Sequence, residues 1–166
     1  MARQECVEIA DSIFWVGSDL SDGLQCNPYL ILDDGEDVLL DPGSVLDFEA
    51  VYNNIVSITN LEKIKYVVLS HQDPDLCSSM PLFERRGLKA KIVTHWRSSV
   101  LQKYYGIKSE FYHVNENGYQ LVLNSGRTFK FIHTPYLHFP GSIVTYDQEN
   151  KVLFSSDLFE IGRAHV

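Results

Sequence analysis

The chain has 166 residues, 45% of them hydrophobic, which is enough for one domain with a substantial core. It carries 14 Lys and Arg against 22 Asp and Glu, and the net charge of −8 argues against nucleic acid as a partner. No apolar run reaches the roughly 20 residues that a membrane span requires, so we expect no membrane partner. The cysteines are odd in number and lack zinc or disulfide spacing, which favours reduced thiols and a cytoplasmic location.

Short strands are predicted at the start of the chain, at residues 6–10, 13–17, 29–32 and 38–40. Asp33-Asp34-Gly35 is a turn signal between the last two runs and predicts a hairpin. Asp41-Pro42-Gly43-Ser44 then ends the strand, because Pro42 cannot donate a ladder hydrogen bond and Gly43 tolerates positive φ.

Helices and strands alternate in the middle of the chain. Apolar residues recur at helical spacing over residues 46–58, and residues 64–69 form a β-branched run typical of a strand buried on both faces. Further helices are expected at 80–86, capped by Ser78 or Ser79, and at 97–105, ended by Gly106. A strand at 89–94 separates these two helices.

The last third of the chain reads as antiparallel strands joined by turns. Strand-like runs cover residues 111–114, 119–123, 128–132, 142–146 and 152–154, with turns rich in Asn, Gly and Asp between them. The whole order predicts an α+β domain with a mixed sheet and helices against one face.

The strongest candidate site is Ser70-His71-Gln72-Asp73-Pro74-Asp75, which follows the most buried strand. His71, Asp73 and Asp75 alternate, so all three side chains project the same way if the stretch stays extended. The residue before a proline avoids helical geometry, which favours an extended Asp73. Two nearby carboxylates repel unless a cation or proton lies between them. The alternative is a loop whose carboxylates cap the next helix.

Two later residues share this placement at the junction of a strand and a loop. His138 lies between two prolines in Pro135-Tyr136-Leu137-His138-Phe139-Pro140, and Asp157 follows the last predicted strand. Taken singly, each has an ordinary interpretation, as a surface histidine or a turn carboxylate. His95, which follows a predicted strand, and His113 and His133, which lie within strand-like runs, are expected to be structural.

The ordered set of these residues resembles the metallo-β-lactamase superfamily. Its elements are Asp41 after an early strand, the His-x-Asp-x-Asp run, the distant His138, and Asp157 at 19 positions beyond it. The carboxylate Asp73, where zinc hydrolases carry a second histidine, resembles the di-iron branch of flavodiiron and oxygen-binding proteins. The resemblance implies a metallo-β-lactamase-like αββα sandwich, here its N-terminal half and part of the second sheet.

By position, the resemblance implies that His71, Asp73 and His138 bind one iron, and that Asp157 bridges to a second iron held by Asp75. Asp41 and Tyr136 would support the centre from an outer shell. Mixed oxygen and nitrogen ligands suit iron, and zinc or manganese are the alternatives. The sequence contains no Gly-rich phosphate loop, so no flavin site is expected in this chain.

The chain departs from the flavodiiron pattern at two points. Leu76 stands where that pattern has a histidine, and the last histidine ligand of the family lies well beyond Asp157. His165 lies too close to Asp157 to replace that last ligand. The final residues, 160–166, match the translation of a sequencing adapter, so we expect the domain to cover 1–159 and this tail to be non-native.

We therefore expect a non-haem di-iron domain that binds O₂ or NO. It would serve as an oxygen sensor, or as a reductase supplied by an electron donor protein or flavin reductase. The alternative function is a zinc-dependent hydrolase of thioesters, esters or phosphodiesters. A third alternative is a fragment that neither closes its site nor covers its sheet edges. The sequence leaves a homodimer open.

Overall fold

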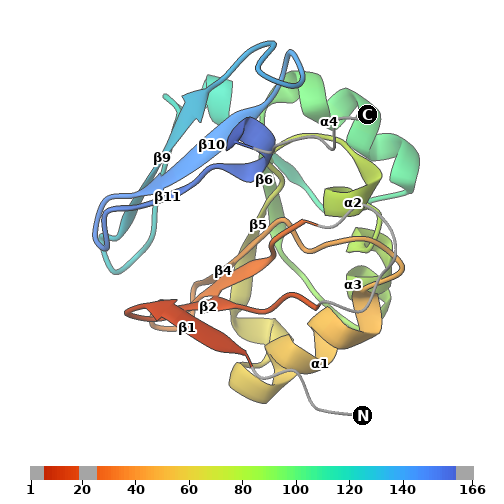
Figure 1. Ribbon diagram of the computed structural model, residues 1–166, viewed down its shortest axis with the longest axis vertical. Helices are drawn as coiled ribbons and strands as arrows, with labels where there is room; N and C mark the ends of the chain where they lie inside the picture. Colours follow the sequence, from red (N-terminus) through yellow and green to blue (C-terminus); the bar gives the residue numbers. More distant parts are fainter. Residues whose placement is uncertain (1–5, 19–25, 160–166) are drawn as a thin grey trace, which may run out of the picture.

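Two β-sheets and one layer of helices make up the part of the chain that the computed structural model describes, residues 6–18 and 26–159 (Figure 1). The larger sheet contains seven strands in chain order: β1 (Val7–Ala10), β2 (Ile13–Trp15), β3 (Tyr29–Ile31), β4 (Asp37–Leu40), β5 (Ile64–Val68), β6 (Lys91–Thr94) and β7 (Phe111–His113). Strands β1 to β4 pair antiparallel, and β4 to β7 pair parallel.

The smaller sheet contains the last strands of the chain, in the order β11-β10-β9-β8. Their bounds are β8 (Gln120–Val122), β9 (Thr128–His133), β10 (Ile143–Asp147) and β11 (Val152–Phe154), all paired antiparallel. The residue pattern predicted one mixed sheet, and the antiparallel run instead forms this second sheet. The two-sheet arrangement agrees with the fold that the family resemblance implied.

Helices cover the outer face of the seven-stranded sheet (Figure 1). They are α1 (Phe48–Ile58), α2 (Pro74–Cys77), α3 (Met80–Arg85) and α4 (Trp96–Gln102). Short 3₁₀ turns occur elsewhere in the described chain at η1 (Leu61–Lys63), η2 (Lys103–Tyr105), η3 (Val114–Glu116) and η4 (Ser156–Phe159). The helix predicted over 97–105 is α4 continued by η2, and Gly106 ends it with φ of 84° as expected.

Alternating side chains of the central strands separate two apolar cores. Leu39 of β4 and Val67 of β5 belong to the core between the large sheet and the helices. Their neighbours Leu40 and Val68 belong to the core between the two sheets, where Phe129 of β9 is fully buried. Burial on both faces explains why β4 and β5 are nearly continuous apolar runs in the sequence.

The turn predicted at Asp33-Asp34-Gly35 is confirmed. It joins the antiparallel pair β3–β4, with φ of 37° at Asp34 and 87° at Gly35. Two consecutive positive φ angles match the right-handed twist of a hairpin, which is why Asp and Gly occur here.

The stretch from His71 to Asp75 does not stay extended, so the condition for its three side chains to project the same way is not met. Asp73 is extended, with φ of −68° and ψ of 152°, but Pro74 begins helix α2 and places Asp75 within it. Proline suits a first helical turn because the amide it lacks has no partner there. The expected serine cap of α3 is also absent, since Ser79 is helical and its hydroxyl donates to the Pro42 carbonyl oxygen.

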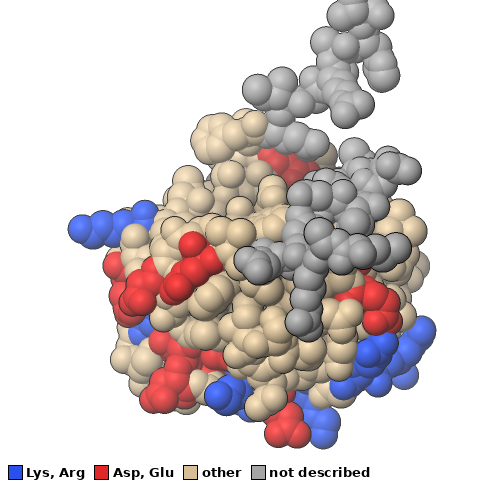
Figure 2. All heavy atoms as spheres, turned by 60° about the horizontal axis from the view of Figure 1, so that its bottom comes forward, with Lys and Arg blue, Asp and Glu red and all other residues tan. Residues whose placement is uncertain are grey.

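Acidic and basic side chains are interspersed over the face of the molecule in Figure 2. Within the described residues, no helix is both long and apolar enough to cross a bilayer. The expected non-native tail, residues 160–166 including His165, lies outside the described residues.

Candidate metal centre

Four side chains of ligand type meet where the two sheets come together. His71 and Asp73 lie in the loop after β5, His138 in the loop between β9 and β10, and Asp157 in η4 after β11. One nitrogen or oxygen atom from each of the four lies within 4.8 Å of the others. The sequence therefore identified a set of residues that the fold brings together from three separate segments.

The individual distances show how close the opposite charges come. The Nε2 atom of His71 lies 3.2 Å from Asp157 Oδ2 and 3.5 Å from Asp73 Oδ2. The Nε2 atom of His138 lies 2.8 Å from Asp73 Oδ2 and 3.7 Å from Asp157 Oδ2. Both carboxylates thus face both imidazoles, as an arrangement around one cation requires.

The His71 imidazole is the buried member of the group, at 1% exposure. Its Nε2 atom is inaccessible to solvent and has no well-oriented hydrogen-bond partner among the described residues, although two carboxylate oxygens lie nearby. Its Nδ1 atom lies 3.4 Å from the hydroxyl of Ser156. A buried nitrogen without a partner is costly unless something binds it. Both nitrogens would have a partner if Nε2 bound a metal ion and Nδ1 kept its contact with Ser156, which would orient the ring.

The charges around His71 favour its protonated form in the metal-free protein. Burial lowers the pKa of this imidazole, but the approach of the Asp157 carboxylate to 3.2 Å and the charges of Asp41, Asp157 and Asp73 outweigh burial and raise it. The interaction with His71 in turn holds the pKa of Asp157 below its usual value, against the effect of burial. A metal cation supplies the same positive charge and displaces that proton.

Asp41 supports the loop rather than the ligand atoms. It follows β4, and its two carboxylate oxygens accept hydrogen bonds of 2.8 and 2.7 Å from the amide and hydroxyl of Ser70, next to His71. Burial raises the pKa of Asp41 to about 6, although its bonds to Ser70 act in the opposite direction. Its φ of 43° is positive, a conformation that aspartate adopts more readily than most residues other than glycine.

The other two predicted residues lie apart from the four ligand-type atoms. Asp75 is on α2 and outside the 4.8 Å group, although burial, with a contribution from the Asp157 charge, raises its pKa. Tyr136 is 76% exposed and borders a separate cavity of about 280 Å³ with His95 and His133. Their proposed roles at the metal stay predictions.

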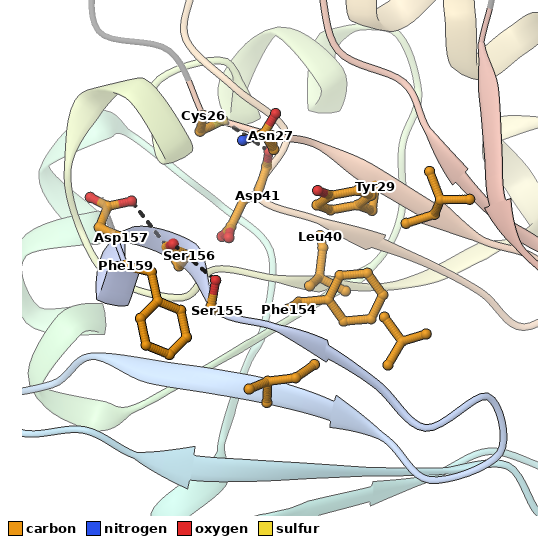
Figure 3. Close-up of a pocket in the computed structure, with 13 residues that line it drawn as sticks. Cys26, Asn27, Tyr29, Leu40, Asp41, Phe154, Ser155, Ser156, Asp157 and Phe159 are labelled. Atoms are coloured by element: carbon orange, nitrogen blue, oxygen red, sulfur yellow. Dashed lines mark hydrogen bonds between the residues drawn. The ribbon is translucent and has the colours of Figure 1, made fainter. Parts of the chain in front are cut away.

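A cavity of about 330 Å³ adjoins the centre between the two sheets (Figure 3). Asp157 and Ser156 lie on one side of it in Figure 3, and Asp41 and Cys26 on the other. The thiol of Cys26 donates a hydrogen bond to the Asp41 carbonyl oxygen at 3.3 Å. The cavity is large enough for small molecules beside the Asp157 carboxylate.

Sequence reasoning missed several side chains around the ligands. Ser156 contacts His71, and Gln102 of α4 donates to the His71 carbonyl oxygen. Ser156 could have been suspected as the neighbour of Asp157, whereas nothing in the sequence links Gln102 to a residue 31 positions earlier. His95 is structural as predicted, since its Nδ1 accepts the Arg97 amide hydrogen at the start of α4.

Comparisons with known proteins agree with this geometry. The family model described as ODP family beta lactamase matches residues 24–163. The chain is 28% identical to the anaerobic nitric oxide reductase flavorubredoxin of Aeromonas hydrophila, covering 92% of this chain and 34% of the relative. Its structure resembles the flavodiiron protein of Giardia intestinalis, with a TM-score of 0.79 and 28% identity over 93% of this chain and 40% of that one.

A structure of the chemotaxis sensor ODP, captured as a peroxy diiron species, is also similar. Its TM-score is 0.69 and its identity 31%, covering 85% of this chain and 57% of the sensor. The chain thus spans less than two thirds of the length of each of these relatives. With the matching fold, these findings place the chain in the ODP family of β-lactamase-like proteins, within the flavodiiron branch of the metallo-β-lactamase superfamily.

Proposed function

We propose that this chain is a non-haem di-iron domain that binds O₂ or NO. The observation that carries the proposal is the convergence of His71, Asp73, His138 and Asp157 within 4.8 Å. Two imidazoles and two carboxylates form a mixed nitrogen and oxygen ligand set. Such a set suits iron, whereas structural zinc sites are typically built from thiolates. Ferrous iron, when bound, supplies electrons and open coordination positions for a diatomic gas.

The residues of the chain hold the metal and shape its surroundings. His71 and His138 would offer Nε2 atoms from two separate loops, while Asp73 and Asp157 would supply the negative charge that balances the cation. Asp41 fixes Ser70, and Ser156 orients the His71 ring, so the ligand geometry is largely set before metal binds.

A second iron would have fewer ligands than the first. Asp75 and the bridging Asp157 would bind it, whereas Leu76 is fully buried in the apolar core and has no ligand atom. Water would complete this weaker coordination. The two metals are therefore expected to bind with unequal affinity.

The output of gas binding depends on what supplies or receives electrons. The similar proteins include both a chemotaxis sensor, seen as a peroxy diiron species, and an anaerobic nitric oxide reductase. Reduction would need an electron donor, and an electron donor protein or a flavin reductase stays the prediction for it. A homodimer and a cytoplasmic location stay predictions.

The test is anaerobic loading with Fe²⁺, followed by metal analysis and absorption spectroscopy on exposure to O₂ and then to NO. Bound iron with a gas-dependent absorption change supports the proposal, and a lasting O₂ adduct favours a sensor over a reductase. Turnover with a donor favours a reductase. Binding of zinc without iron, and no spectral response to either gas, would overturn the proposal and return the hydrolase alternative.

A further inference from the structure

We propose that helix α4 is the positioning element of the metal centre, because Gln102 holds the His71 peptide and Ser98 holds the loop that carries His138. This inference rests on the proposed metal centre and adds residues to it that do not bind metal. His71 and His138 belong to segments that follow different sheets, so something must fix one histidine relative to the other. A single helix that contacts both segments can do this.

Gln102 is a buried side chain whose amide points at the His71 backbone. It has no exposed surface, and its Nε2 atom donates hydrogen bonds of 2.7 Å to the His71 carbonyl oxygen and 3.2 Å to Thr94 Oγ1. Thr94 Oγ1 donates its own hydrogen to the Leu69 carbonyl oxygen, so it can only accept from Gln102. Both partners therefore require the NH₂ end of the amide, which fixes its orientation.

The orientation of the Gln102 amide leaves its oxygen unpaired and favours the hydrogen bond to the His71 carbonyl. The Oε1 atom of Gln102 is buried and has no hydrogen-bond partner among the described residues, which is an unfavourable environment for an amide oxygen. Gln102 is the strongest donor to the His71 carbonyl, since the other contact is the weak Cys77 thiol at 3.2 Å. From the same helical segment, the Tyr105 hydroxyl donates to the Gln72 carbonyl oxygen at 2.9 Å.

The other loop is attached one helical turn earlier. The Ser98 hydroxyl donates to the Gly141 carbonyl oxygen at 3.0 Å, three residues after His138. A Cβ atom at Gly141 would lie 2.6 Å from Ser98 Oγ and 2.9 Å from the Ser98 amide nitrogen, so only glycine allows this approach. Ser98 and Gln102 are four residues apart and lie on one face of the helix, which therefore contacts both histidine-bearing loops.

The predicted consequence is that α4 preorganises the metal ligands. Partners of this kind, which orient a ligand without binding metal, typically contribute about 10- to 100-fold in metal affinity. Because α4 acts on the backbone of the ligand loops, its effect should appear for any divalent ion that uses His71 and His138. It should not depend on gas binding or electron transfer.

The main experiment compares Gln102→Met with wild type by titrating the full chain with Co²⁺ and, anaerobically, with Fe²⁺. We expect the Co²⁺ dissociation constant to rise about 10-fold or more, with altered visible absorption of the bound cobalt. The matched control is Ser99→Ala on the same helix. Ser99 is buried, and its hydroxyl bonds to the Trp96 carbonyl and to His113 but not to either ligand loop. The Co²⁺ affinity of Ser99→Ala should therefore change less than about twofold.

A second pair of variants separates positioning from general destabilisation. In a His71→Ala background the Gln102→Met change should alter Co²⁺ affinity less than in wild type, because one of the two ligands on the loop that Gln102 positions is gone. Ser98→Ala should weaken Co²⁺ binding through the His138 loop and is the milder variant if Gln102→Met does not fold. Thermal unfolding of each metal-free variant measures any loss of folding separately.

Three results would overturn the inference: unchanged Co²⁺ affinity in Gln102→Met, an equal loss in Ser99→Ala, or an undiminished effect of Gln102→Met in the His71→Ala background. Unchanged Co²⁺ affinity in Ser98→Ala would contradict the proposal that α4 positions the loop of His138. If the chain binds Co²⁺ in this way but shows no response to O₂ or NO, the positioning role holds and only the proposed gas-binding function fails.

Discussion

The Nε2 atom of His138 lies 2.8 Å from Oδ2 of Asp73, although 65 positions separate these residues in the chain. Asp73 follows a strand of the large sheet, and His138 lies between two strands of the small sheet. The contact therefore forms only when the two sheets pack against each other. Metal bound at this junction would stabilise the packing itself, so metal affinity and folding should be linked.

The first prediction concerns His138, the proposed ligand in the loop between β9 and β10 of the small sheet. His138→Ala should weaken binding of the first Fe²⁺ by at least about 100-fold. Removing a residue that only orients a metal ligand typically weakens binding by about 10- to 100-fold, and removing the ligand itself should weaken it more. The measurement is anaerobic Fe²⁺ titration with metal analysis, together with the rise in unfolding temperature on metal addition. His138→Ala should show a smaller rise than wild type.

His113→Ala is the matched control. His113 contacts the hydroxyl of Ser99 and lies 3.4 Å from Glu116, and it is not among the four ligand-type residues. Its variant should bind iron as wild type does. Equal iron binding by the two alanine variants would exclude His138 as a ligand.

Much of the element order could be predicted from local pattern. Apolar spacing and breaker residues located the helix at Phe48–Ile58 and the buried strand at Ile64–Val68 within two residues of their ends. The hairpin at Asp34 and Gly35 followed from the positive φ that these residues tolerate. Such features depend on neighbours in sequence, which is why a single chain is enough to find them.

What could not be predicted depends on contacts between distant residues. Pro74 has two effects: it favours an extended Asp73, and it is well suited to the first position of a helix. The helix that begins at Pro74 is what determines where Asp75 lies. The division into two sheets depends on which strands pair, which alternation within a strand does not reveal. Gln102 was missed because its partner is a backbone carbonyl, and a carbonyl leaves no mark on residue identity.

The second prediction concerns the pH dependence of folding in the metal-free protein. The pKa of Asp41 is raised by burial to about 6 in the folded state, so the folded protein holds a proton there that the unfolded chain loses nearer 3.8. The stability gained from this proton is complete below 3.8 and is lost as pH rises through about 6. The shift corresponds to no more than about 3 kcal/mol.

Asp41→Asn tests this directly, because an amide can accept from the Ser70 amide and donate to its hydroxyl without ionising. Between pH 4 and about 6.5, the free energy of unfolding should fall less in Asp41→Asn than in wild type, as measured by urea denaturation at each pH. Asp34→Asn, a change at an exposed turn position, should follow wild type. Parallel curves for wild type and Asp41→Asn would contradict the assignment.

The third prediction concerns the buried ion pair of Arg127 and Asp147. Arg127 Nη2 lies 2.6 Å from Asp147 Oδ2 in the small sheet, and Nη1 donates to the Leu32 carbonyl oxygen after β3, so this side chain joins the two sheets. Arg127→Met leaves a buried carboxylate without its cation and should cost about 3–5 kcal/mol of unfolding free energy.

Replacing both partners, as Arg127→Met with Asp147→Leu, should recover much of that loss, because no charge then stays buried. The exposed pair of Lys91 and Glu110, at 3.4 Å, provides the comparison, and Lys91→Met should cost about 0–1 kcal/mol. Urea denaturation of all four proteins measures these values. A cost for Arg127→Met as small as that for Lys91→Met would show that the pair does not hold the sheets together.

The fourth prediction concerns the position where this chain departs from the flavodiiron pattern. Leu76 is fully buried in the core, follows Asp75, the residue proposed to bind a second iron, and supplies no donor atom. Leu76→His should increase the amount of Fe²⁺ retained per chain, because a second metal would gain a nitrogen ligand beside Asp75 and Asp157. The same change should lower the stability of the metal-free protein by roughly 1–3 kcal/mol, since it buries a polar ring.

Leu76→Met separates the two effects, because it changes the shape of the side chain without adding a nitrogen and should cost less than about 1.5 kcal/mol. It should retain only as much iron as wild type. Metal analysis after anaerobic loading and desalting compares the three proteins, and thermal unfolding with and without Fe²⁺ shows whether added metal offsets the buried ring. If Leu76→His and Leu76→Met retain the same amount of iron, the weak second site is limited by something other than the missing histidine, and the ligand role of Asp75 loses its support.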